Sequence, residues 1–327
     1  MNLSLVRFVV GAMLLACVVF VSVAHAQPYP NKPIRLVVPY GPGGPSDVLA
    51  RVLADEMAKT LGQPIVIDNR PGAGSMLGTE LAARSLADGY TLLLTDLPVT
   101  IVPHVMKSIA KYDPVRDLEP ISLIGTTTLG FYVPAESPAR TIAEFVAASR
   151  SKRDGVQIGS GGNGTLTHLM AEVFAHAASF QMAHVPYQGI GPAMPDLLSG
   201  RLDGMFNSYL TTQPFIAGGK LRPLAVASRI RAAELPAVPT FAEAGWPAVS
   251  VEYWLGIAGP VGLPRPVSDA VRAALAKALQ SPVVKERFQS LALTASEDLS
   301  AAALRSAIQA DQKRWGDVVR DRRISTN

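Results

Sequence analysis

The sequence predicts an α/β protein with two lobes, each built from a mainly parallel sheet flanked by helices. Short apolar strands alternate with amphipathic helices, which is the pattern of sheets covered by helices on both faces. The alternation breaks near residues 120–133, where two apolar runs follow one another without a helix between them, and it then restarts. About 300 residues remain after a leader, which is enough material for two domains of ordinary size.

The leader, residues 1–26, has the composition of a secretory signal peptide. Arg7 is its only charged residue, an apolar run covers 8–23, and Ala24-His25-Ala26 is the small-x-small pattern of a cleavage site. We therefore expect the signal to be cleaved after Ala26 and the mature protein to be exported. The segment 14–17 resembles a lipoprotein signal, but apolar residues continue past Cys17, which disfavours lipidation.

Composition limits the class of partner and the source of stability. Cys17 is the only cysteine, so the mature chain has no disulfide and must be held by its core, for which a full sequence with 48% apolar residues provides enough material. The formal charge of +4 becomes +3 when Arg7 leaves with the signal. No dense run of lysine and arginine occurs, so we do not expect nucleic-acid binding.

The first lobe is expected to begin with a strand, a glycine-rich turn and a helix at 37–51. We expect Ser46 to cap this helix with Asp47 in its first turn, and Gly62 to end it. Further strands are predicted at 64–68 and 90–94, and residues 69–74 should form another turn with glycine before a helix of small residues. The first strand itself should cover 34–38.

The second lobe repeats the βα pattern, and the chain then returns to the first lobe. Strands are predicted at 156–160, 181–186, 202–207 and 221–227, with helices at 142–151, at 165–178 and in a short segment ending at Gly200. The return strand is expected at 249–258, followed by helices near 266–280, 282–291 and 299–320. We assign 27–124 and 229–327 to lobe I and 125–228 to lobe II. Two or more connections between lobes favour a hinge.

Two glycine-rich turns predict anion-binding sites. The first, before the helix that Ser46 is expected to cap, presents backbone N–H groups and the positive end of a helix dipole. The second is Gly159-Ser160-Gly161-Gly162-Asn163-Gly164-Thr165, again between a strand and a helix, with Thr165 as the expected N-cap. A tight turn that needs glycine only for its backbone conformation is the simpler alternative.

Other uses of the second turn find less support. Gly159, Gly161 and Gly164 match the dinucleotide pattern G-x-G-x-x-G, but Tyr187-Gln188 stand where the ribose-reading acid belongs. Neither turn continues into Gly-Lys-Ser/Thr, and Ile158 replaces the first glycine of a G-x-S-x-G elbow. We therefore expect neither a nucleotide nor another cofactor.

A helical face carrying His168, Glu172 and His176 resembles a metal site in spacing alone. The two histidines are about 12 Å apart along the helix axis at 1.5 Å per residue, so they cannot share one ion. We expect no metal, and a solvated or cleft-lining face instead. His168, in the first turn, could still donate a hydrogen bond into the cleft.

Four further candidates follow from the rule that ligands bind beyond the carboxyl ends of strands in open sheets. They are Thr95, Asp96, Tyr187 and Asn207. A tyrosine that merely covers the sheet edge explains Tyr187 equally well. Asp96 would repel an anion unless it meets a cationic or amide group, and a helix cap is its alternative role.

Five motifs, in this order, resemble the solute receptors of tripartite tricarboxylate transporters, also called Bug-type periplasmic binding proteins. They are PYGPGGPSDVLAR, NRPGAG, GSGGNGTLTHL, AHVPYQGIGPAMPDLLSG and LPAVPTFAEAG, and they extend over essentially the whole mature chain. The resemblance implies a periplasmic protein with a type II Venus-flytrap fold. It also implies that a carboxylate is held between two pincers and delivered to a two-component membrane symporter.

Carried onto this chain, the resemblance assigns residues to each pincer. The first pincer is Tyr40, Gly43, Gly44, Pro45, Ser46 and Asp47. The second is Ser160, Gly161, Asn163, Gly164, Thr165 and His168, and Tyr187 matches the VPY tyrosine of the family. Many members have phenylalanine where Tyr40 stands, so its hydroxyl is a candidate additional contact.

The sequence is compatible with three functions. The first is a monomeric, non-catalytic receptor for a small organic carboxylate. The second is a secreted hydrolase of a carboxylate or ester, with Ser160 and His168 as the candidate pair but no evident orienting acid. The third is a receptor that signals through a membrane partner instead of serving transport. Side chains of the cleft, such as Tyr253 and Trp254, should decide which carboxylate is bound.

Overall fold

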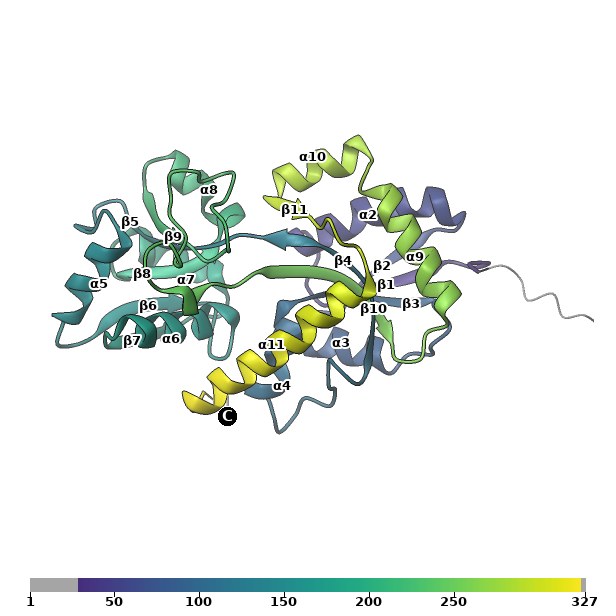
Figure 1. Ribbon diagram of the computed structural model, residues 1–327, viewed down its shortest axis with the longest axis horizontal. Helices are drawn as coiled ribbons and strands as arrows, with labels where there is room; N and C mark the ends of the chain where they lie inside the picture. The colour runs from purple at the N-terminus through teal and green to yellow at the C-terminus, as the bar shows by residue number, and fades with distance from the viewer. Residues whose placement is uncertain (1–28, 325–327) are drawn as a thin grey trace, which may run out of the picture.

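The computed structural model describes residues 29–324, so the predicted signal peptide, its cleavage site and Cys17 lie outside the described part. Two sheets lie side by side, each flanked by helices, and together they form the two lobes of Figure 1. The predicted two-lobed α/β class is therefore confirmed. Within residues 29–324, no helix is both long and apolar enough to cross a membrane.

The sheet of the first lobe has six strands in the order β11-β4-β10-β3-β1-β2. Their bounds are β1 (Ile34–Val38), β2 (Ile65–Asn69), β3 (Thr91–Asp96), β4 (Leu118–Thr127), β10 (Tyr253–Pro260) and β11 (Leu293–Ala295). β1 pairs in parallel with β2 and β3, whereas β10 runs antiparallel to β3 and β4. The sheet is thus mixed, because β4 leaves for the other lobe and β10 returns beside it in the opposite direction.

Helices cover both faces of this sheet (Figure 1). They are α2 (Pro45–Leu61), α3 (Met76–Ala83), α4 (Val102–Val105), α9 (Arg265–Ala278), α10 (Pro282–Ser290) and α11 (Ala301–Asp321), with short 3-10 turns η1 (Ala73–Ser75) and η2 (Leu97–Thr100). β1 is buried on both faces. Its alternate residues Leu36 and Val38 pack in the cluster under α2 and α9, and Val37 packs in the opposite one. This explains why the strand is a continuous apolar run.

The sheet of the second lobe has five strands in the order β7-β6-β8-β5-β9. Their bounds are β5 (Leu129–Pro134), β6 (Val156–Ser160), β7 (Met182–Pro186), β8 (Gly204–Ser208) and β9 (Leu221–Val226), and the helices are α5 (Ile142–Arg150), α6 (Leu166–Ala178), α7 (Ile190–Leu198) and α8 (Tyr209–Ala217). β6 is parallel to β7 and β8, and β5 is antiparallel to β8 and β9. Phe131 anchors the core, with edge-on contacts to Phe145, Phe174 and Phe206 at centroid distances of 4.9, 5.2 and 5.1 Å.

Two chain segments connect the lobes and are hydrogen-bonded to each other. β4 continues through one residue into β5, and the second segment returns from β9 through η3 (Pro247–Val249) to β10. The Ala227 N–H donates to the Leu129 carbonyl at 2.8 Å, and the Val251 N–H donates to the Ala227 carbonyl at 2.7 Å. The lobes are thus joined by a short paired ribbon. Where the chain divides between them, at 124/125 and 228/229, stays a prediction.

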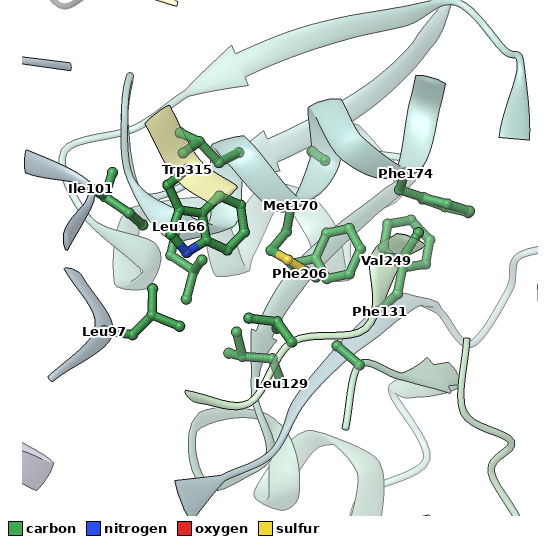
Figure 2. Packing of buried hydrophobic residues seen from close by; sticks show 14 of the residues in the cluster. Leu97, Ile101, Leu129, Phe131, Leu166, Met170, Phe174, Phe206, Val249 and Trp315 are labelled. Atoms are coloured by element: carbon green, nitrogen blue, oxygen red, sulfur yellow. The ribbon is translucent and has the colours of Figure 1, made fainter. Parts of the chain in front are cut away.

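The C-terminal helix α11 ties the two lobes together on one side of the ribbon (Figure 1). Its fully buried Trp315 lies among Leu97 and Ile101 of the first lobe and Leu166 and Met170 of the second (Figure 2). The apolar cluster therefore continues from one lobe to the other.

Candidate functional site

A cavity of about 710 Å³ lies between the two lobes. The predicted residues on its wall from the first lobe are Tyr40, Gly44, Pro45 and Ser46, and those from the second are Gly161, Asn163, Gly164, Thr165 and Asn207. Both glycine-rich turns thus face one cavity, although they are more than a hundred residues apart in the chain. Its volume is within the range of small-molecule sites.

Four helices begin at this cavity. The first residues of α2, α6, α7 and α8 line it, and none of these helices has a side-chain hydrogen bond capping its N-terminus. By contrast α5, away from the cavity, has a complete capping box between Thr141 and Glu144. Helices α9 and α10 also lack side-chain caps, so the absence of a cap is not distinctive by itself. The convergence of four uncapped N-termini on one space is the distinctive feature, and it favours an anion.

The predicted capping role of Ser46 is wrong. Helix α2 begins at Pro45, two residues earlier than a cap at Ser46 would place it, with Gly44 in the N-cap position and no side-chain cap. Proline is well suited to the first helical position, because its fixed φ matches the helix and it has no N–H to satisfy. Ser46 lines the cavity instead, in the first turn of the helix.

Asp47 braces the first turn from behind and does not line the cavity. Its buried carboxylate accepts from the Gly43 N–H at 2.9 Å, from Asn69 Nδ2 at 2.9 Å and from the Arg51 guanidinium at 2.9 and 3.0 Å. These hydrogen bonds, that of Arg51 above all, lower the pKa of Asp47 to about 2. The N–H of Gly43, a residue with φ of +82°, is therefore already hydrogen-bonded to Asp47. Both residues shape the turn from outside the cavity wall.

The second turn is braced in the same manner. The Gly161 N–H donates to Thr167 Oγ1 at 3.0 Å, and the Gly164 N–H donates to His168 Nδ1 at 3.1 Å. Gly162 and Gly164 have φ of +123° and +74°, which favours glycine at both positions. Thr165 occupies the N-cap position of α6, but its hydroxyl donates to the Gly162 carbonyl at 2.8 Å. Conformation thus explains part of this glycine pattern, as the simpler alternative supposed.

The serine–histidine pair considered for hydrolysis is not formed. Ser160 Oγ lies 2.6 Å from Nε2 of His184, on the neighbouring strand β7, and His168 instead accepts from a backbone N–H. The His184 ring stacks on His168 at a centroid distance of 3.7 Å, and burial together with this neighbour lowers the pKa of His184 to about 4. Ser160 is fully buried and absent from the cavity wall. Ser160, His168 and His184 thus form a cluster that supports the turn at 159–165 from outside the cavity wall.

On the helical face considered for a metal site, His168 and Glu172 contact each other and belong to the same cluster as Ser160 and His184. His168 Nε2 approaches Glu172 Oε1 at 3.6 Å, and this contact lowers the pKa of Glu172. Across residues 29–324, no group of three or more histidine, aspartate or glutamate side chains is placed to hold a metal ion.

Beneath the wall formed by Tyr40 and Tyr253 lies the buried carboxyl of Asp96. Tyr40 and Tyr253 donate their hydroxyls to Asp96 Oδ2 at 2.6 and 2.8 Å. Burial raises the pKa of Asp96 to about 6 despite these two donors, and it raises the pKa of both tyrosines well above their usual value. Asp96 stands in the N-cap position of η2 but makes no capping bond. It lies outside the cavity wall, as does the neighbouring, buried Thr95.

Asn207 and Tyr187, both at strand ends, have different surroundings. Asn207 lines the cavity and is buried; its Oδ1 accepts from the Ser208 N–H at 2.7 Å, while its Nδ2 has no partner among the described residues. A buried amide N–H without a partner is costly, so Nδ2 of this cavity-lining residue is a candidate donor to a ligand. Tyr187 is absent from the wall and donates its hydroxyl to Asp196 at 2.6 Å, which agrees with the sheet-edge alternative.

The sequence reasoning missed most of the apolar wall. It includes Pro98, Ile101, Val102, Val105 and Met106 in and beside η2 and α4, Leu255 of β10, Leu291 at the end of α10 and Leu293 of β11. Isolated apolar residues in a sequence predict core, so no local signal distinguished these from buried neighbours. No local signal pointed to His184 either, because its contact with Ser160 depends on the pairing of β7 with β6.

Comparisons with known proteins agree on one family. Residues 49–324 match the model of the tripartite tricarboxylate transporter family receptor. The chain is 33% identical over 326 residues to protein BugT of Bordetella pertussis, covering 98% of both chains. The solved structure of periplasmic binding protein BugD is similar, with a TM-score of 0.77, 31% identity and coverage of 91% of this chain and 100% of that one.

A further solved structure was described with a ligand. MatC from Rhodopseudomonas palustris with bound malate has a TM-score of 0.76 and 30% identity, covering 89% of this chain and all of that one.

Proposed function

Because this chain belongs to the tripartite tricarboxylate transporter receptor family, we propose that it captures one small organic carboxylate between its lobes in the periplasm and delivers it to a two-component membrane symporter. The malate described in MatC, a structure with the same fold, supports a carboxylate as the ligand class. We further propose that the chain acts as a monomer, has no catalytic role and loses its leader after Ala26. The hydrolase alternative finds no support, since Ser160 is buried outside the cavity.

One observation carries this proposal: four uncapped helix N-termini from both lobes converge on one cavity. Backbone N–H groups and neutral side chains can hold a carboxylate without a lysine or arginine, because each charge-assisted hydrogen bond contributes about 1.5–3 kcal/mol. The donors are divided between the lobes, with α2 in the first and α6, α7 and α8 in the second, so separating the lobes breaks up the set. Opening about the paired ribbon would therefore release the cargo.

Within this scheme the predicted site residues fall into two groups. We propose that Ser46, Asn163 and Asn207, with the first turns of the converging helices, contact the carboxylate. A second group would hold the turns in shape without touching ligand, namely Gly43, Asp47, Ser160, His168 and Asp96. We keep the division into lobe I (27–124 and 229–327) and lobe II (125–228). The second sheet supports it, because all of its strands lie between Leu129 and Val226.

Titration of ligand-stripped protein tests the proposal. The protein would be unfolded in denaturant, dialysed and refolded, then titrated calorimetrically and by thermal shift with mono-, di- and tricarboxylates. The neutral amide of each acid serves as its control. At least one acid should raise the melting temperature in proportion to ln(1 + [L]/Kd), while its amide should not. Correctly refolded protein that responds to no carboxylate would contradict the proposal.

The signalling alternative is separated from transport by uptake. Cells that lack the membrane symporter but retain this receptor should fail to accumulate the radiolabelled ligand. A receptor used only for signalling would leave uptake unchanged when its own gene is deleted.

A further inference from the structure

We propose that Asp96 is a proton-binding site coupled to carboxylate capture, so that the protein takes up a proton when its anionic cargo binds. This inference rests on the proposed function, because it requires an anion in the cavity between the lobes. Two observations carry it. Asp96 is buried with neutral hydrogen-bond donors alone, and both of these donors belong to residues of the cavity wall.

The Asp96 carboxyl is buried without an ion pair. Only 3% of the residue is exposed, and its Oδ2 accepts from the hydroxyls of Tyr40 and Tyr253. Within residues 29–324, no positive charge stabilises its ionised form. An ionised carboxylate in such surroundings is costly, so the site favours the protonated form more than an ordinary aspartate does.

Asp47, the buried carboxyl that braces the first turn, shows the contrast. It is 2% exposed, but Arg51, Asn69 and the Gly43 N–H all donate to it. These donors lower the pKa of Asp47 to about 2, whereas burial raises the pKa of Asp96 to about 6. Of these two carboxyls, Asp96 is therefore the one that changes its charge between pH 5 and pH 8.

Other titratable groups near Asp96 do not replace it in this role. Tyr112 donates its hydroxyl to a backbone carbonyl at 3.0 Å, and burial raises its pKa, as it does for the two tyrosines at the ends of β1 and β10. His104 of α4 bonds a backbone carbonyl at 2.9 Å, and burial lowers its pKa. Glu80 of α3 accepts a backbone N–H at 2.7 Å, and Asp311 of α11 accepts an indole N–H at 2.7 Å.

The position of Asp96 couples its charge to the cavity. Tyr40 lines the cavity together with Gly44 and Ser46, which begin the helix that we propose to contact the carboxylate, and Tyr253 lines it as well. At an effective dielectric constant near 20, two negative charges about 10 Å apart weaken each other's binding roughly tenfold. A bound anion thus raises the pKa of Asp96, and protonation of Asp96 strengthens anion binding by the same factor.

The hydrogen bonds around Asp96 suit both of its protonation states. When ionised, the carboxylate accepts from both tyrosines. When protonated, it donates its proton to one tyrosine oxygen, which has free lone pairs, and still accepts from the other. The proton comes from solvent, and the O–H bond on the carboxyl is the one covalent bond that forms. Proton uptake therefore leaves no polar atom of the cluster unpaired.

Calorimetry of ligand-stripped protein counts the protons directly. The probes are malate, adipate and benzoate, extended to the rest of the carboxylate panel if none of the three binds. Each would be titrated at pH 7 in MOPS and in imidazole, because the difference in enthalpy between two buffers gives the number of protons taken up. With a tenfold coupling, wild type should take up about 0.4 proton per acid bound, and its dissociation constant should rise about fivefold between pH 6 and pH 8.

Two asparagine variants show whether Asp96 is the source. Asp96→Asn keeps an acceptor for the tyrosines and should take up less than about 0.1 proton, with a dissociation constant that no longer follows pH in this way. Asp311→Asn is the matched control, since Asp311 is a part-buried carboxyl with a raised pKa outside the cavity wall, and it should keep the uptake of wild type. If Asp96→Asn does not fold, Tyr253→Phe replaces it. Loss of that donor to the ionised carboxylate should move the pH of maximal uptake upward, and an unchanged profile would contradict the assignment.

The outcomes separate this inference from the proposed function. Carboxylate binding by wild type without proton uptake, or uptake that persists in folded Asp96→Asn, would overturn the inference and leave the proposed function standing. Refolded protein that binds no carboxylate of the panel would overturn both.

Discussion

Asn207 offers the sharpest perturbation of the proposed carboxylate site. Asn207 lines the cavity; its Oδ1 accepts the Ser208 N–H at 2.7 Å, whereas its Nδ2 is buried and has no partner among the described residues. Asn207→Asp keeps the size of the side chain and the acceptor for Ser208, but it replaces the free donor with a carboxylate oxygen. The variant therefore changes the wall of the cavity more than the packing around it.

Two terms set the expected loss of affinity. Removing a hydrogen bond to a charged group costs about 1.5–3 kcal/mol. A second carboxylate about 4 Å away adds repulsion of up to about 4 kcal/mol at an effective dielectric constant of 20. Even partial repulsion brings the sum above about 2.7 kcal/mol, so the dissociation constant should rise at least a hundredfold. Asn207→Ala loses only the first term, and its affinity should fall roughly 10- to 150-fold.

Isothermal titration of the ligand-stripped proteins measures the dissociation constants of wild type, Asn207→Ala and Asn207→Asp. Gln181→Glu is the matched control, because it makes the same amide-to-carboxylate change at an exposed position of the second lobe. Circular dichroism confirms that each variant is folded at the assay temperature. If folded Asn207→Asp bound within threefold of wild type, Nδ2 would not contact the carboxylate and the reasoning would be refuted.

Three further predictions concern stability. The pKa of Asp47 is about 2 in the folded state and 3.8 in the unfolded state, so its ionised form stabilises the fold by roughly 2 kcal/mol above pH 3.8. This stabilisation is lost as the pH falls through about 2. In urea unfolding, the free energy of unfolding of Asp47→Asn should therefore be lower than that of wild type at pH 7 and equal to it at pH 2. Folding shifts the pKa of Asp96 in the opposite direction, from 3.8 to about 6, so the free energy of unfolding should fall by roughly 3 kcal/mol as the pH rises between these values. If the Asp96→Asn variant showed the same fall, the ionisation of Asp96 would not be its cause. Trp315→Ala should cost about 3–5 kcal/mol in urea unfolding, because the fully buried ring joins both lobes, and a loss below about 1 kcal/mol would show that the junction is not tightly packed.

The elements were predictable because their signals are local. The strands predicted at 34–38 and 156–160 coincide with β1 and β6, and the return strand at 249–258 overlaps β10. Apolar period and glycine punctuation are properties of short windows, so a single sequence suffices to recognise them. The start of α2 was misplaced by two residues, because serine at a helix start suggests a cap while proline competes for the first position.

The contacts of the site were less predictable, since they join distant parts of the chain. Asp96 meets Tyr40 across 56 positions and Tyr253 across 157. Ser160 meets His184 because β6 and β7 are parallel neighbours in register, and no motif encodes that pairing. Both glycine-rich turns contribute residues to one cavity, and their role in ligand binding stays a prediction. Their division into wall residues and bracing residues needed the side-chain contacts.

The identity of the cargo tests the central claim most directly. The native protein, purified without denaturation, would be examined by native mass spectrometry, and the small molecule released on unfolding would be identified by its accurate mass. The account predicts one organic acid per chain, carrying a carboxylate. A neutral or cationic compound in that stoichiometry, displaced by no carboxylate, would contradict it.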